Sequence, residues 1–323
     1  MHFVTPTRCT SLPDVVVELD TPRAPDFTRY RKAAARLRST GVTHVTIADN
    51  SLSHARVSNV AAAFVLKNEF GLEPIVHLNC RDRNLLAQQS TVFGLIALGI
   101  RHFLLISGDA LALGDNPSGK AVFETDSLGL MERFQRLEAG VDFFGRTLDE
   151  PLDVCYGGAI NLGRRSPAHL QRMQAKIARG ARYFFSQPVF AEEDLLRLAE
   201  AQDKVGQTAA VYVGMMPLIS AASARFLSRV PGVFVPERVI RSLEPFEGEA
   251  AITAGLAYAE SLVQTAMAYG LRRFYLITPF LRASTTAHLV RRIREAMPRT
   301  DRAHGPGRMG RSFDSDVKSA HMT

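Results

Sequence analysis

The sequence predicts a single-domain α/β protein, a closed (β/α)8 TIM barrel, and three observations lead to this fold class. Short β-rich runs recur along the 323 residues, and segments with helical periodicity separate them. The first four runs begin at residues 15, 44, 73 and 102, a constant spacing of 29 residues. Strand and helix therefore alternate, which implies parallel strands with crossover helices, and eight such units suit a closed barrel.

The predicted elements follow one another in a regular order. The eight strands are expected at 15–20, 44–49, 73–79, 102–109, 153–160, 183–189, 209–217 and 273–279. Apolar residues at helical spacing predict nine helices within 27–40, 54–70, 84–99, 126–140, 169–181, 192–202, 222–230, 251–270 and 285–297. Several of these segments end in Gly, which is a common helix C-cap. The long loop 108–127, rich in Gly, Pro and Asp, is of a kind that is often functional or mobile.

Composition excludes several classes of protein. With 46% hydrophobic and 22% charged residues the chain is typical of a soluble globular protein, and no apolar run approaches the roughly 20 residues of a membrane helix. The N-terminus lacks the apolar centre of a signal peptide, so we expect a cytoplasmic protein. Of the net charge of +7, residues 291–323 supply +4. We therefore expect a barrel domain over 1–299, a basic, disordered and catalytically dispensable tail over 300–323, and neither nucleic-acid nor membrane partners.

The cysteines and one histidine raise the question of a metal. Cys9, Cys80 and Cys155 are odd in number, far apart and without a CxxC pair, and we interpret them as free thiols. His77 and Cys80 are three residues apart and both are zinc ligand types. The alternative is that His77 belongs to a polar rim, which the barrel favours, and we expect no metal site.

Polar residues end seven of the eight predicted strands. In such barrels the active site lies at the C-terminal ends of the strands, so these residues should converge on one mouth. They suggest a site that binds a large ligand with many hydrogen-bonding groups, and they are Glu18, Asp20, Thr46, Asp49, Asn50, His77, Asn79, Ser107, Asp109, Asn161, Gln187 and Thr278.

Two carboxylates, Glu18 and Asp109, each follow an apolar run and are candidates for partial desolvation. Desolvation raises a carboxyl pKa and provides a general acid near neutral pH. The alternative is a pair of rim acids held by Arg or backbone donors. Neither a P-loop nor a GxGxxG, nucleophile-elbow or HExxH motif is present, so the residues alone indicate a barrel enzyme with an acidic, metal-free mouth.

The rim segments together resemble the methylenetetrahydrofolate reductase family of flavin-dependent (β/α)8 enzymes. The resemblance extends from about residue 15 to 285 and is closest to the reductase half of bifunctional bacterial proteins that also carry a homocysteine methyltransferase half, which has no counterpart in this sequence. It rests on "VVVELDTP", "VTIADNSLSHAR", "EPIVHLNCRDRN", "LGIRHFLLISGDA", "KIARGARYFFSQPVF", "VGMMPLISAASARFLSRVPGVFVPE" and "FYLITPFLR".

The resemblance implies roles for individual residues. Glu18 would be the catalytic acid that protonates N10 of the folate, and Asp109 a catalytic residue beside both the flavin N1 edge and the pterin. Gln187 would hydrogen-bond folate, and Phe226 would stack on substrate or nicotinamide. The residues implied to hold FAD are Thr46, His77, Gly108, Asp109 and Lys176, with Phe123, Glu124 and Arg172 as weaker matches. Arg81 and Arg83 are then expected either near phosphates or on the outer surface.

The implied activity is a ping-pong reaction at one face of the barrel. NAD(P)H reduces FAD, leaves, and is replaced by 5,10-methylenetetrahydrofolate, which becomes 5-methyltetrahydrofolate. Two alternatives remain: a related enzyme that oxidises 5-methyltetrahydrofolate or acts on another pterin, and a non-catalytic barrel paralogue that serves as a subunit. The chain departs from the family at Leu19, Asp20 and Ala110, and Arg164 is expected to replace a cofactor-binding His. The choice between NADH and NADPH and the oligomeric state, a homo-oligomer included, stay open.

Overall fold

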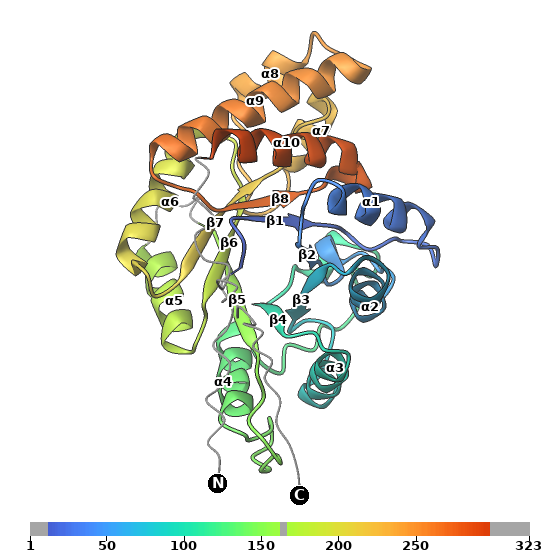
Figure 1. The fold of residues 1–323 in the computed structure, drawn as a ribbon, viewed down its shortest axis with the longest axis vertical. Helices are drawn as coiled ribbons and strands as arrows, with labels where there is room; N and C mark the ends of the chain where they lie inside the picture. Colours follow the sequence, from blue (N-terminus) through green and yellow to red (C-terminus); the bar gives the residue numbers. More distant parts are fainter. Residues whose placement is uncertain (1–11, 162–166, 298–323) are drawn as a thin grey trace, which may run out of the picture.

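Eight parallel strands close into a barrel in the order of the sequence, as predicted. The computed structural model describes residues 12–161 and 167–297, and the expected tail 300–323 and Arg164 lie outside this range. Figure 1 shows the strands at the centre of the molecule with helices around them. The strands are β1 (Val15–Glu18), β2 (His44–Ile47), β3 (Glu73–Asn79), β4 (His102–Ile106), β5 (Cys155–Ile160), β6 (Tyr183–Pro188), β7 (Ala210–Met215) and β8 (Phe274–Ile277).

Helices separate the strands and form the outer layer. They are α1 (Thr28–Arg38), α2 (Asn59–Phe70), α3 (Leu85–Ala97), α4 (Ser127–Glu138), α5 (Pro167–Ala178), α6 (Glu192–Val205), α7 (Ala221–Leu227), α8 (Glu237–Leu243), α9 (Gly248–Ala268) and α10 (Ala283–Ala296). Each of the nine predicted helices is present, and the structure adds α8, a short helix of seven residues that was not predicted. Figure 1 shows α8 and α9 at one end of the molecule, above α10 in this view.

Local signals in the sequence explain where several helices begin and end. The Asn84 side chain accepts from the Ala87 amide at 2.9 Å, and the Asp126 side chain accepts from the Leu128 and Gly129 amides. These bonds satisfy amides that the first turn of a helix leaves without partners. Gly71 ends α2 in the left-handed conformation, with φ +58°.

The core has two layers, because successive side chains of a strand point to opposite faces of the sheet. The outward side chains pack against the helices in one large cluster. The inward side chains fill the barrel with a smaller cluster that includes Val16, Ile75, Leu104, Phe185 and Tyr275. The Phe185 and Tyr275 rings stack with their centroids 4.6 Å apart, so the barrel interior is a packed aromatic plug below the mouth.

Two expectations about cysteines and charge can be compared with this structure. Cys80 is free and buried, whereas Cys155 is disulfide-bonded, so the expectation of free thiols is wrong for Cys155.

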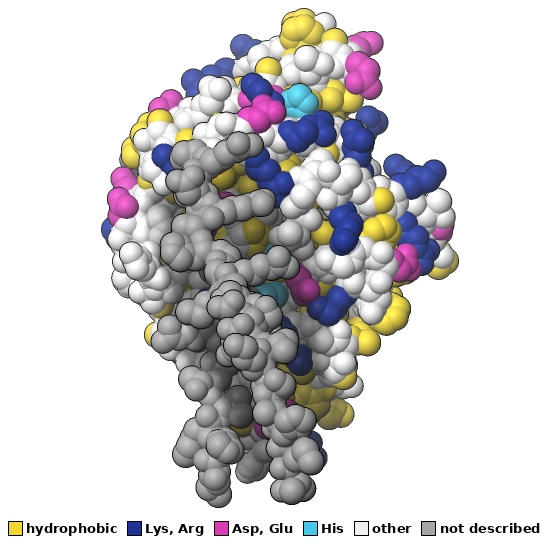
Figure 2. Space-filling view, in the orientation of Figure 1, with side chains coloured by type: hydrophobic (Ala, Val, Ile, Leu, Met, Phe, Trp, Pro, Cys, Tyr) yellow, Lys and Arg dark blue, Asp and Glu magenta, His cyan; other side chains and the backbone are white. Residues whose placement is uncertain are grey.

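Among the described helices none combines the length and apolar character that crossing a membrane requires. Figure 2 shows Lys and Arg side chains spread over several helices of this face with Asp and Glu between them, rather than gathered in one stripe.

Candidate active site at the barrel mouth

Glu18 is the acidic residue at the end of β1, and the two-residue period of the strand places it on the same inward face as Val16. Its side chain is 13% exposed. Its Oε2 accepts hydrogen bonds from the hydroxyl of Tyr275 on β8 and from Thr46 Oγ1 on β2, the latter at 3.5 Å. Residues from three neighbouring strands therefore hold one carboxyl at the mouth.

The environment of Glu18 favours its protonated form. Burial, and next the negative charge of Asp20, raise the pKa of Glu18 to about 8. The hydrogen bonds from Tyr275 and Thr46 and the charge of Arg56 act in the opposite direction but do not outweigh burial. At neutral pH the Glu18 carboxyl carries a proton that it can donate, which is what a general acid requires.

His77 lies beside Glu18, since its Nε2 is 3.8 Å from Glu18 Oε2. Burial lowers the pKa of His77 to about 3, so the imidazole is neutral and the pair is not an ion pair at physiological pH. Its Nε2 is buried and has no hydrogen-bond partner among the described residues. A buried ring nitrogen without a partner is available to a ligand in the mouth.

Cys80 does not share this position. It packs in the outer cluster between the barrel and the helices, on the other side of the sheet from His77, and burial raises the pKa of its thiol to about 12. No group of three or more His, Cys, Asp or Glu residues suited to a metal ion occurs within 12–161 and 167–297. The geometry of this pair therefore gives no support to the zinc alternative.

Arg81 organises the loops beside the mouth. Its side chain is among the largest that are fully buried, and its five N–H donors all have partners: the Asp82 carboxylate, Ser53 Oγ, and the carbonyls of Asn50 and Asp109. Neither expectation for Arg81 is met, because it lies inside the protein and has no donor left for a phosphate. Arg83 is also engaged internally, with Asp49 at 2.7 Å.

The segment that Arg81 holds has a strained backbone. Asn50, Leu52 and Ser53 have φ of 49°, 52° and 60°, a region that residues other than Gly rarely adopt. Such conformations persist where the surroundings fix them, and they cluster at ligand sites. The guanidinium of Arg81 and the Asp109 carboxylate, which accepts from the Leu52 amide at 2.8 Å, supply that support.

Asp109 is thus part of the loop network rather than of the Glu18 cluster. It is exposed, so the desolvation expected from the sequence applies to Glu18 and not to Asp109. The neighbouring Gly108 has φ +95°, and a Cβ there would lie 3.1 Å from the Cβ atoms of both Asn79 and Arg81. Only glycine fits this conformation and this close approach without strain.

Lys176 on α5 reaches the barrel from outside. Its ammonium donates to the carbonyl of Ala159 at 2.9 Å, and two of its three N–H groups have no partner within the described ranges. Burial lowers its pKa to about 8. Gln187, partly exposed at the end of β6, lies close to Gly232 of the loop after α7. Phe226 on α7 is 50% exposed.

The three weaker candidates lie in the loop before α4 or on α5. The Glu124 carboxylate accepts from the Leu85 amide at the start of α3, at 2.7 Å. Arg172 pairs with Asp126 at 3.0 Å, and both side chains are about half exposed. Phe123 has φ +38° and is 47% exposed. The structure therefore places all three on the β4–α4 side of the mouth, separate from Glu18.

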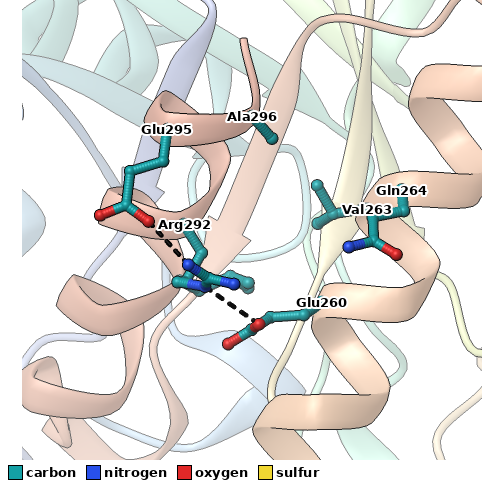
Figure 3. Close-up of a pocket in the computed structure, with 7 residues that line it drawn as sticks. Glu260, Val263, Gln264, Arg292, Glu295 and Ala296 are labelled. Atoms are coloured by element: carbon teal, nitrogen blue, oxygen red, sulfur yellow. Dashed lines mark hydrogen bonds and ion pairs between the residues drawn. The ribbon is translucent and has the colours of Figure 1, made fainter.

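A hollow between α9 and α10 lies away from the mouth. Its volume is about 250 Å³, and it is formed by Glu260, Val263 and Gln264 of α9 and Leu289, Arg292, Glu295 and Ala296 of α10. Figure 3 shows Arg292 between Glu260 and Glu295, and both ion pairs are formed. Because α10 begins at the mouth and runs back along the barrel, its last turns lie towards the opposite end. The charges here satisfy one another and mark no reactive group.

The sequence did not point to Tyr275 as a residue of the mouth, and it did not predict that Arg81 is buried beside it. Tyr275 occupies a strand position whose pattern is that of an ordinary core aromatic, and nothing local indicates that its hydroxyl meets Glu18 across 257 positions of sequence. Arg81 was noticed, but its burial depends on three loops that the sequence does not place. The only local indication that Arg81 could be buried was the presence of possible partners, Asp82 and the Asp and Asn residues nearby in the sequence.

A closed (β/α)8 barrel with a protonated, partly shielded carboxyl at the C-terminal mouth is the architecture of a barrel enzyme with a general acid. The chain belongs to the methylenetetrahydrofolate reductase family, whose profile matches residues 13–293. A relative from Caenorhabditis elegans, described as a probable methylenetetrahydrofolate reductase (NADPH), is 22% identical over 196 residues, which are 59% of this chain and 27% of the relative. The chain thus spans about a quarter of that relative's length.

A solved structure shares the fold. It is an uncharacterized protein from Clostridium thermocellum that binds two copies of 5-methyl-5,6,7,8-tetrahydrofolic acid, and it superposes with a TM-score of 0.60 at 12% identity. The similarity covers 88% of this chain and 95% of the other. At this identity the likeness concerns the barrel itself.

Proposed function

We propose that this protein reduces 5,10-methylenetetrahydrofolate to 5-methyltetrahydrofolate, with FAD as cofactor and NAD(P)H as the source of the hydride. Membership of the family supports the reaction class. The observation that carries the proposal is the protonated Glu18 carboxyl at the mouth, where a folate nitrogen would need a proton. The folate ligands of the Clostridium thermocellum protein agree with a folate as substrate.

The residues at the mouth fit a flavin. Inside the mouth, the unpartnered Nε2 of His77 can meet a polar group of a bound cofactor. On the outer side of β5, the spare N–H donors of Lys176 can meet another. Gly108 lets the loop after β4 pass close to Asn79 and Arg81 beside the mouth, in a conformation that a side chain would strain. With Thr46 and Asp109, these residues would hold FAD, which when bound transfers hydride between the nicotinamide and the folate.

The remaining steps fall to the chain itself. Glu18 would give its proton to the substrate nitrogen, Gln187 would orient the folate by a hydrogen bond, and Phe226 would offer an exposed ring for stacking. Phe123, Glu124 and Arg172 would complete the cofactor site on the β4–α4 side. A single mouth that receives nicotinamide and folate in turn suits a ping-pong order.

The purified protein provides the test. We expect a flavin absorbance spectrum, directly or after reconstitution with FAD, that bleaches on anaerobic titration with NADH or NADPH and returns on addition of 5,10-methylenetetrahydrofolate. Addition of 5-methyltetrahydrofolate to the oxidised protein measures the reverse direction. A protein that cannot be reconstituted with FAD would refute the proposal and favour a non-catalytic barrel.

A further inference from the structure

The two oxygens of the Glu18 carboxyl have different surroundings. Oε2 accepts hydrogen bonds from the Tyr275 hydroxyl and from Thr46 Oγ1. Oε1 accepts no hydrogen bond from the described residues. It is also not fully buried, so a ligand can reach it. One oxygen is therefore fixed by the protein, and the other is left to a ligand in the mouth.

The position of Tyr275 is itself rigid. Its ring stacks on Phe185 at 4.6 Å and an interplanar angle of 13°, within the aromatic plug that fills the barrel. Only the hydroxyl rises above this plug to reach Glu18. A donor held this firmly loses little freedom when it forms the bond, which makes it an effective support for a neighbouring group.

We propose that Tyr275 is a positioning residue for the catalytic acid: its hydroxyl engages Oε2 and leaves Oε1 as the oxygen that exchanges a proton with the substrate. The inference rests on the proposed function. In the step itself the O–H bond at Oε1 breaks, a new N–H bond forms on the substrate, and Glu18 is left as a carboxylate. The Tyr275 hydrogen bond then faces a full negative charge and becomes stronger.

Every charged or titratable group that faces Glu18 can influence its proton. Asp20 lies two residues after it, beyond the end of β1, His77 faces it from β3, Tyr275 faces it from β8, and Arg56 faces it from the loop before α2. His77 is neutral because of burial, and Arg56 is paired with Asp20 at 3.2 Å. Tyr275 differs from these because it donates directly to the carboxyl.

The test is a pH titration of Glu18 in the ligand-free protein. Infrared difference spectroscopy measures the protonated carboxyl band at each pH, and the loss of that band in Glu18→Gln assigns it to Glu18. We expect Tyr275→Phe to move the midpoint upward from about 8 by roughly one pH unit, because the hydrogen bond favours the carboxylate. Tyr212→Phe is the matched control. Its ring also contacts Phe185, but its hydroxyl donates to the Leu12 and Pro13 carbonyls, and we expect an unchanged midpoint.

A second variant separates the hydrogen bond from packing. Tyr275→3,5-difluorotyrosine keeps the ring and makes the hydroxyl a stronger donor, so the midpoint should move downward, opposite to Tyr275→Phe. An unchanged midpoint in both variants, or an equal upward change in Tyr212→Phe, would overturn the inference. Because this titration needs neither flavin nor folate, its outcome is independent of whether the proposed reaction occurs.

Discussion

Replacement of Glu18 by Gln is the most direct test of the mechanism. Gln keeps the size and hydrogen-bonding reach of the side chain but has no proton to give, so the folate half-reaction should slow by roughly 10²–10⁴. Flavin reduction by NAD(P)H needs no proton from Glu18 and should stay within about an order of magnitude of wild type. Anaerobic stopped flow measures the two half-reactions separately.

The structure also sets the size of the pH effect. With a pKa of about 8, Glu18 is roughly 90% protonated at pH 7, whereas the ordinary value of 4.5 would leave roughly 0.3% of the acid form. Burial therefore increases the concentration of the proton donor about 300-fold. In wild type the folate half-reaction should lose about tenfold in rate between pH 7 and pH 9, while Glu18→Gln should show no such decline.

Asp20→Asn provides the matched control. It removes a neighbouring charge that raises the pKa of Glu18 but keeps the acid, so the decline should begin at lower pH while the plateau rate below it is retained. Equal loss of both half-reactions in Glu18→Gln would show a structural role for Glu18. Full retention of the folate half-reaction would mean that another group supplies the proton.

Three further predictions concern stability and are measured by urea unfolding. Arg81→Met should lower the free energy of unfolding by about 3–5 kcal/mol, because it leaves buried partners without their donor. Arg31→Met breaks an exposed pair and should leave the free energy of unfolding nearly unchanged; equal losses in the two variants would contradict the network. Gly108→Ala should lower the free energy of unfolding by about 1–3 kcal/mol more than Gly145→Ala. The two glycines have similar φ, +95° and +94°, but only a Cβ at Gly108 would meet close neighbours. Burial lowers the pKa of His44 from 6.5 to about 4, so the unfolded state binds the proton first as pH falls. The protein should therefore lose up to about 3 kcal/mol of stability between these two pH values. His44→Gln should weaken this pH dependence, and an unchanged pH profile would exclude His44 as its source.

The sequence predicts the barrel well because its signals are local and repeated. A strand every 29 residues, with helical segments between, leaves few arrangements that bury both faces of the sheet. Glu18 was identifiable for the same reason: an acid at the end of an apolar run must lie near the mouth. The prediction that it is desolvated agrees with its 13% exposure.

The contacts around the mouth were not predictable in this way. Asp109 has the same sequence context as Glu18 but is exposed, since its loop turns towards Leu52 rather than into the barrel. Tyr275 has an ordinary core pattern, and its second role depends on the closure of β8 onto β1. Such roles come from the meeting of distant segments, which no local pattern encodes.

Glu18 and His77 show how one physical cause gives two different results. Burial disfavours charge on both, which raises the pKa of the acid to about 8 and lowers that of the imidazole to about 3. Transfer of the proton from Glu18 to His77 would therefore oppose a gap of about five pH units, although the side chains are 3.8 Å apart. The pair stays neutral at physiological pH, and the proton remains on Glu18 until a ligand nitrogen accepts it. The carboxylate that is then formed has the Tyr275 and Thr46 hydroxyls already in place to stabilise it.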